Sequence, residues 1–359
     1  MGINEIIIYI MVLFAVLGAL DRMIGNKFGL GEQFEEGIKA IGVLAISMVG
    51  MISLAPVLAN ILEPIVVPVF KFLGADPAMF IGAILANDMG GAPLAQALAL
   101  DVDAGNFGGL IVGAMLGVTI VFTIPAALGI ARKEDQKYIA SGVMAGVITV
   151  PVGSFAGGVA AGYSVSMILS NLLPIVLIAA LIAVGLWKFE NAMIQGFSWF
   201  GKIIMALITL GLIAGIVESL TGIVVIPGMT PIEEGFAVVA EISMVLAGAF
   251  PMVRVLTKAC KKPLMKLGGF LHMNEVGAAG IVASLANSIP MFGMLKEMDN
   301  RGKVINMAFA TSAAFVFGDH LGFTAGFCAE MVFPMIVGKL VGGVSAVIVA
   351  MFMLRKEFK

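Results

Sequence analysis

Asn87-Asp88-Met89-Gly90-Gly91 interrupts one run of apolar residues, and Asn274-Glu275-Val276-Gly277-Ala278 interrupts another 187 positions later (274 − 87). Both segments follow the order asparagine, acid, apolar residue, glycine, small residue. An ionised carboxylate in a hydrocarbon environment costs about 2.5–3.5 kcal/mol on insertion scales, so such a residue usually faces protein interior or water and has a function. Glycine allows a helix to stop and exposes backbone carbonyls. The two segments therefore predict broken helices that carry polar binding sites.

The composition around these segments is that of a membrane protein. Of 359 residues, 60% are hydrophobic and 12% are charged, whereas soluble domains average about 45–50% apolar and about 25% charged residues. The net charge is −2 and no basic run is dense enough to neutralise a phosphate backbone, so we expect no nucleic acid partner. The sequence holds no P-loop, dinucleotide motif or Ser/His/Asp set, and it predicts neither catalytic residues, nor a cofactor, nor a metal site.

Nine runs are apolar and long enough to cross a bilayer, which requires about 20 residues. They are residues 3–20, 40–62, 107–130, 138–162, 167–187, 203–220, 237–253, 304–323 and 327–354. Two further stretches, 77–100 and 263–295, are apolar but broken by the two segments quoted above.

The short loops give the expected orientation, because cytoplasmic loops are enriched in Lys and Arg. Basic residues cluster in loops 132–137, 254–266, 296–303 and 355–359, which we expect in the cytoplasm, whereas loops 101–106, 163–166 and 221–234 contain none and belong outside. The chain is then cytoplasmic on both sides of 263–295, so this stretch reads as a hairpin that enters from the cytoplasm. The same count makes 77–100 a hairpin from outside and places the N-terminus outside.

The resemblance between the halves suggests a duplication. We expect an all-α polytopic membrane protein of about nine transmembrane helices plus two re-entrant or broken hairpins, arranged as an inverted repeat. Residues 1–166 would form the first repeat with hairpin 77–100, residues 167–196 a linker helix and a cytoplasmic loop, and residues 197–359 the second repeat with hairpin 263–295. In secondary transporters of this plan, interrupted segments at corresponding positions indicate the binding site.

The candidate substrate-binding residues come from these interruptions and from one acid–histidine pair in the segment FGDHLGF. They are Asn87, Asp88, Gly90, Asn274, Glu275, Gly277, Asp319 and His320. Two alternatives stay open. In the first, each hairpin acid caps a half-helix, where the helix dipole favours negative charge. In the second, Asp319-His320 is not a substrate or proton site but an interfacial pair at the outer end of a span. Gly109, Gly113 and Gly117 form a small-residue face that predicts close helix packing, within one subunit or in a homodimer.

Several long strings carry a family resemblance. They are MGINEIIIYIMVLFAVLGALDR (1–22), SLAPVLAN (53–60), AILANDMGGAPLA (83–95), NEVGAAGIVASLANSIPMF (274–292) and FGDHLGF (317–323). Over essentially the whole chain the sequence resembles the ethanolamine utilisation transporter family, EutH. The resemblance implies a multi-pass permease of the bacterial cytoplasmic membrane that imports ethanolamine for catabolism, by carrier-type alternating access or by facilitated diffusion.

Ethanolamine fits the residues, since it is a small primary ammonium with a hydroxyl at neutral pH. Asp88 and Glu275 would accept its N–H donors, and Asn87 or Asn274 would serve the hydroxyl. Whether both acids contact the cargo is open. The alternatives are a carrier of another small cation or a nucleoside-like solute, a channel-like facilitator, and a membrane scaffold protein.

Overall fold

The computed structural model describes residues 2–357, without the side chains of residues 260–262, 264, 265, 267 and 355–357. The described residues form α-helices joined by short turns and hold no strand, as is required where a bilayer offers backbone groups no hydrogen-bond partner. The α-helices are α1 (Ile3–Met23), α2 (Leu30–Leu44), α3 (Gly50–Phe72), α4 (Ala78–Ile84), α5 (Gly91–Leu98), α6 (Val102–Asn106), α7 (Ile124–Ile130), α8 (Gln136–Ala160), α9 (Val165–Lys188), α10 (Glu190–Thr221), α11 (Ile232–Phe270), α12 (Glu275–Ala286), α13 (Ser288–Met294), α14 (Asn300–Ala313), α15 (Asp319–Phe327) and α16 (Val332–Glu357).

Shorter π-helical and 3-10 segments join some of these helices. The π-helices are η1 (Ala45–Val49), η3 (Phe107–Gly117) and η4 (Thr119–Thr123), and the 3-10 turns are η2 (Asn87–Met89), η5 (Lys133–Asp135), η6 (Leu295–Glu297) and η7 (Ala329–Met331). The π-helices join α2 to α3 and α6 to α7, so each of these stretches is continuous.

Eight continuous stretches of the described residues are long and apolar enough to cross a membrane. They are Ile3–Met23, Leu30–Phe72, Val102–Ile130, Lys133–Ala160, Val165–Lys188, Glu190–Thr221, Ile232–Ala259 and Ala329–Leu354. The all-α polytopic membrane fold is therefore confirmed. The predicted ninth run, 304–323, is not a continuous helix.

This run is broken between α14 and α15 by contacts with a distant segment. Phe315 has φ 63°, a left-handed conformation that is unusual for a bulky residue. Its N–H donates to the Ser284 carbonyl at 2.9 Å, and the Phe317 N–H donates to the Leu285 carbonyl at 2.9 Å. The freed backbone groups are thus satisfied by another part of the chain, which explains why an apolar run without proline can stop being helical.

The predicted broken hairpin at 77–100 is present as α4, η2 and α5. Its two ends meet at Asp76, whose carboxylate accepts from the N–H groups of Leu100 and Asp101 at 2.9 and 3.1 Å and from that of Ala78 at 2.8 Å. At about 1.5 Å per residue, α4 and α5 each reach only part of the way across a hydrocarbon core of about 30 Å. The tip of the hairpin therefore ends inside the protein.

The second hairpin consists of α12 and α13, and it begins later than predicted. Helix α11 runs through Pro263 to Phe270, and the chain turns at His272, where φ is 54°. The mouth is closed by Asn274, whose N–H donates to Asp299 Oδ1 at 3.0 Å and whose Nδ2 donates to the Glu297 carbonyl at 2.9 Å. The tip is the extended residue Asn287.

The order of elements repeats along the chain. Five parts occur twice in the same order: a span, a long helical stretch, a hairpin, a fourth segment and a last span. In the first half they are α1, α2 to α3, α4–α5, α6 to α7 and α8. In the second half they are α10, α11, α12–α13, α14–α15 and α16. The two hairpin tips share the residues Leu-Ala-Asn at 85–87 and 285–287, an offset of 200 (287 − 87). The predicted alignment of Asn87 with Asn274 is therefore wrong, because Asn274 lies at a mouth and Asn287 at a tip. The division at 166 and 197 and the inversion of the second repeat stay predictions.

Two contacts tie together segments far apart in the sequence. Lys303 Nζ donates to Asp135 Oδ1 at 2.6 Å, which connects two loops expected in the cytoplasm. Asn4 Nδ2 donates to the Glu330 carbonyl and Asn4 Oδ1 accepts from the Phe333 N–H, which connects α1 with η7 and the start of α16. The side chains of residues 261, 262 and 355–359, also predicted to be cytoplasmic, lie outside the described residues.

The glycine face of η3 is used inside the subunit. A Cβ on Gly109 would lie 2.8 Å from Ala92 Cα, and one on Gly117 would lie 1.9 Å from the Leu85 carbonyl oxygen. Gly113 faces the same hairpin. The face therefore seats the first hairpin, and of the two predicted uses the structure shows the one within a subunit.

Candidate functional site

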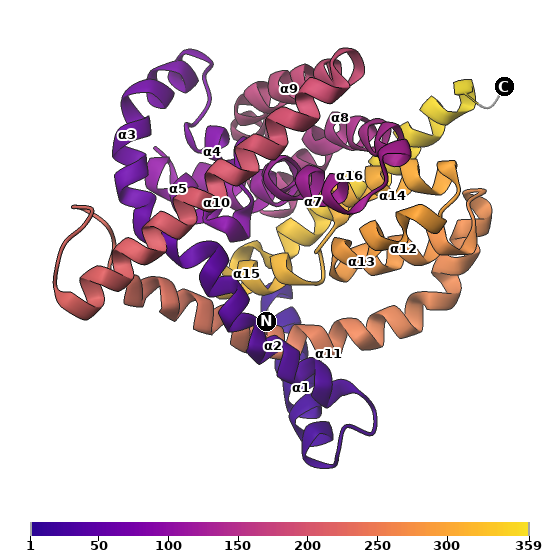
Figure 1. Ribbon diagram of the computed structural model, residues 1–359, viewed down its shortest axis with the longest axis horizontal. Helices are drawn as coiled ribbons and strands as arrows, with labels where there is room; N and C mark the ends of the chain where they lie inside the picture. The colour runs from indigo at the N-terminus through magenta and orange to yellow at the C-terminus, as the bar shows by residue number, and fades with distance from the viewer. Residues whose placement is uncertain (1, 358–359) are drawn as a thin grey trace.

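The start of α15 lies between the two hairpins, at the centre of the molecule. In Figure 1, α4 and α5 lie to its upper left and α12 and α13 to its right. His320 Nε2 lies 3.8 Å from Asp88 Oδ1 at the first tip, and Gly318 packs against the backbone of Ala286 at the second. Asp319 directly precedes His320 at the start of α15. The structure thus brings Asp88, Asp319 and His320 together from predicted sites more than 200 residues apart.

The sequence of the first tip explains its shape. Leu85 and Ala86 are extended, Asn87 to Met89 form a single 3-10 turn, and Gly90 takes φ 82° before α5 starts. A Cβ on Gly90 would lie 2.1 Å from Met51 Cγ, so glycine is required for both conformation and space. This turn fully buries Asn87 and leaves both polar atoms of its side chain without a hydrogen-bond partner among the described residues.

An aromatic wall flanks the carboxylates. The His320 ring stacks on Phe315 at 5.3 Å between centroids, and Phe315 meets the edge of Phe122 at 5.7 Å. Neither ring nitrogen of His320 has a hydrogen-bond partner in the described part of the chain. Buried polar groups in native proteins nearly always have partners, so the unpaired groups of Asn87 and His320 are available to bond a polar ligand.

Lys339 of α16 completes the charged groups at the centre, and the sequence analysis missed it. Its side chain is 1% exposed, and its Nζ donates to the carbonyl of Ala114 in η3, next to Gly113, which faces the first tip. The signal was available, because Lys339 interrupts the apolar run 327–354 as the acids interrupt theirs. The cost of burying a charge applies to an ammonium as well as to a carboxylate, so the criterion that selects the acids also selects Lys339.

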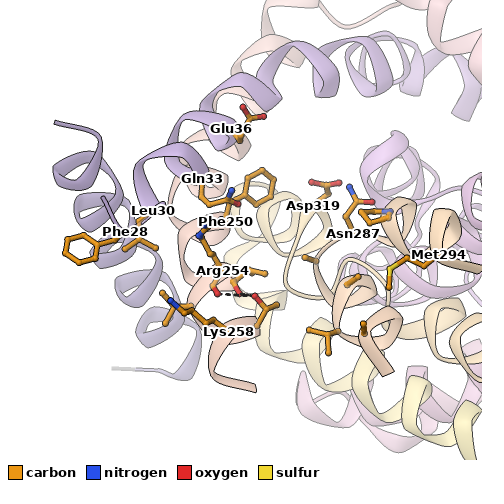
Figure 2. Close-up of a pocket in the computed structure, with 18 of the residues that line it drawn as sticks. Phe28, Leu30, Gln33, Glu36, Phe250, Arg254, Lys258, Asn287, Met294 and Asp319 are labelled. Carbon is orange, nitrogen blue, oxygen red and sulfur yellow. Dashed lines mark hydrogen bonds between the residues drawn. The ribbon is translucent and has the colours of Figure 1, made fainter. Parts of the chain in front are cut away.

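A cleft of about 1160 Å³ leads from one end of the molecule to this centre. It runs between α2 and α11 on one side and the second hairpin on the other. Figure 2 shows Asp319 and Asn287 next to each other on one wall, with Gln33, Glu36, Phe250 and Arg254 across the open space. The basic residues Arg254 and Lys258 in its lining come from a loop expected in the cytoplasm. The cleft therefore connects Asp319 and the second tip with the side predicted to be cytoplasmic.

Comparisons with known proteins find relatives over almost the whole chain. A family model described as "Ethanolamine utilisation protein, EutH" matches residues 3–353. The chain belongs to the EutH family. A "Probable ethanolamine permease EutH" of Listeria monocytogenes is 63% identical over 359 residues, which cover 100% of this chain and 96% of the relative.

More distant relatives share the same full-length similarity. A "Probable ethanolamine permease EutH" of Escherichia coli is 50% identical, covering 99% of this chain and 97% of the relative. A protein of Bacillus subtilis named "Uncharacterized protein YxeR" is 51% identical, covering 98% of this chain and 95% of that protein. No solved structure matches the chain.

In this EutH-family chain, three predicted site residues lie apart from the central carboxylates. Asn274 and Glu275 are exposed at the mouth of the second hairpin, where Asn274 Oδ1 caps α12 by accepting from the Gly277 N–H at 2.9 Å. Gly277 is buried, and its carbonyl accepts from Asn306 Nδ2 at 2.8 Å. The prediction that Asn274, Glu275 and Gly277 lie at the break within the second hairpin is therefore wrong. Asparagine followed by an acid is also an N-cap pattern, and here the helix-capping alternative describes the segment.

The remaining predicted residues form the candidate site. Asn87, Asp88 and Gly90 build the first tip, and Asp319 and His320 begin α15, where His320 is buried and Asp319 lines the cleft. Among the described residues, no group of three or more His, Cys, Asp and Glu side chains is placed to hold a metal ion. What the site offers is two carboxylates, an unpartnered amide and an aromatic wall.

Proposed function

We propose that this chain carries ethanolamine across the bacterial cytoplasmic membrane, into the cell, for use in catabolism. The observation that carries the proposal is the position of Asp319 on the wall of the cleft, next in the chain to His320, whose ring nitrogen Nε2 lies 3.8 Å from Asp88 Oδ1. The names of the relatives at 63% and 50% identity supply the cargo. A membrane-embedded scaffold would have no use for two such carboxylates at the centre of the protein.

The chemistry of the site suits an ammonium ion with a hydroxyl. Two carboxylates in a poorly hydrated place repel each other, and a cation between them relieves that repulsion. The three N–H donors of the ammonium would be accepted by Asp88 and Asp319. The open amide of Asn87 would bond the hydroxyl, and the two methylene groups would lie against the wall of Phe315 and His320. Gly90 shapes this tip without contacting the cargo.

The access routes favour a carrier over an open channel. One route to the site is the cleft that ends at Asp319. On the far side the first hairpin packs tightly, with Leu85 against Gly117 and Met51 against Gly90. Transport then requires this hairpin to separate from η3 and α3 while the cleft closes. Such alternating access supports facilitated diffusion and needs no nucleotide-binding domain.

Uptake of labelled ethanolamine into cells or proteoliposomes tests the proposal. It should be measured in acidic medium, where the uncharged amine is too scarce to diffuse through the bilayer. Asp88→Asn and Asp319→Asn should each lower uptake about 10- to 100-fold, since a hydrogen bond to a charged group contributes about 1.5–3 kcal/mol.

The matched control is Glu275→Gln, which neutralises an exposed carboxylate at the hairpin mouth and should leave uptake within about twofold of wild type. Membrane content of each variant must be shown equal. The proposal is wrong if the wild-type chain does not transport ethanolamine, or if Asp88→Asn and Asp319→Asn transport it at the wild-type rate.

A further inference from the structure

Lys339 is a buried cation in a site that should bind a cation. Its side chain is 1% exposed, and its amino group is held by the Ala114 carbonyl of η3. Ala114 follows Gly113, which packs against the Asn87 backbone at the first tip. A buried ammonium needs an opposite charge nearby, and Asp88 is the acid of this tip. The ammonium of a cargo would use the same carboxylate, so Lys339 and the cargo depend on one partner.

The charges at the centre can be counted. At their formal charges, Asp88 and Asp319 carry two negative charges and Lys339 one positive charge, with His320 neutral. The sum is one negative charge, and one bound ammonium makes it zero. The other charged groups lining the cleft are exposed and are screened by water; they are Lys27, Glu36, Arg254 and Lys258.

We propose that Lys339 sets the charge selectivity of the site by acting as a tethered ammonium, so that only singly charged amines are accepted. A cargo with two ammonium groups would leave an uncompensated positive charge in a poorly hydrated place, which is strongly unfavourable. Lys339 does not have to contact the cargo for this. The inference rests on the proposed function, because it concerns the same carboxylates and the same cargo.

The test compares ethanolamine with 1,2-diaminoethane, which replaces the hydroxyl by a second amine at nearly the same size. In acidic medium the diamine carries two charges. The wild-type chain should take up ethanolamine and be inhibited only weakly by the diamine. Lys339→Gln keeps a donor for the Ala114 carbonyl but removes the charge, and it should raise the diamine's potency relative to ethanolamine by about tenfold or more. Lys339→Arg, which keeps the charge, should retain the wild-type ratio.

A matched control is Lys303→Gln, which removes another largely buried lysine. Lys303 lies in the first turn of α14 and pairs with Asp135. It should leave the ratio unchanged. If Lys339→Gln does not insert, the wild-type protein still tests the idea. Inhibition by the diamine, measured against the monoamine 1-amino-2-propanol, should weaken as falling pH adds the diamine's second proton.

The outcomes separate the two proposals. An unchanged ratio in Lys339→Gln overturns the charge-selectivity role while ethanolamine transport stands, and so does wild-type inhibition that stays constant as the diamine gains its second charge. Absence of ethanolamine uptake by the wild-type protein overturns the proposed function itself.

Discussion

Gly90 is the residue on which the first hairpin tip depends. Its φ of 82° costs a residue with a side chain about 1–3 kcal/mol, and a Cβ would also collide with Met51. We expect Gly90→Ala to lower both the thermal unfolding midpoint in detergent and ethanolamine uptake, the latter about tenfold. Gly42→Ala is the control, because Gly42 is helical and has open space around it. Equal behaviour of the two variants would mean that the tip tolerates a side chain.

At the residue scale, the sequence predicted those site residues whose chemistry conflicts with an apolar run. Asp88 and Asp319 are such residues, and the structure places His320, the neighbour of Asp319, 3.8 Å from Asp88. Glu275 fulfils the same criterion but lies at a helix start, where an acid is locally stabilised by the dipole. One sequence cannot separate these cases, because letters such as Asn-acid-apolar-Gly fit a helix cap as well as a hairpin tip.

The hairpin mouths are the elements that hold each tip in place. At the first mouth, Asp76 accepts three backbone N–H bonds, and each donor left without a partner costs about 1–3 kcal/mol. Asp76→Ala should therefore destabilise the hairpin strongly and speed hydrogen exchange in α4 and α5. Asp101→Ala removes a carboxylate that accepts one bond, from the Ala104 N–H, and should have a clearly smaller effect. Similar rates of hydrogen exchange in both variants would contradict the inference that Asp76 holds the two ends of the first hairpin together.

At the element scale, hydropathy was enough for the eight spans and for the first hairpin, which proline and glycine delimit. It was not enough for the break between α14 and α15. The segment Ala313-Ala314-Phe315-Val316-Phe317 holds neither proline nor glycine. It leaves the helix because the carbonyls of Ser284 and Leu285 accept from the N–H groups of Phe315 and Phe317. Those acceptors come from the second hairpin. The break between α14 and α15 therefore follows from tertiary contacts, and no local sequence pattern predicts it.

At the scale of the whole molecule, the inverted repeat predicts opposite sides for the two hairpin mouths. Between Asp101 and Asn274 the chain runs through Val102–Ile130, Lys133–Ala160, Val165–Lys188, Glu190–Thr221 and Ile232–Ala259. Five crossings are an odd number, so a chain that leaves the first mouth outside reaches the second in the cytoplasm. The linker α9 supplies the crossing that makes the count odd.

Labelling with a membrane-impermeant thiol reagent tests this arrangement. The background has Cys260 and Cys328 changed to serine. In it, Leu100→Cys at the first mouth should react with the reagent in intact cells. Glu297→Cys at the second mouth should react only after the membrane is permeabilised. Both residues are exposed, so a lack of reaction reports on sidedness and not on burial. Reaction of both from the same side would mean that one of the five stretches does not cross, and the cleft and the first hairpin could then not give access from opposite sides of the membrane.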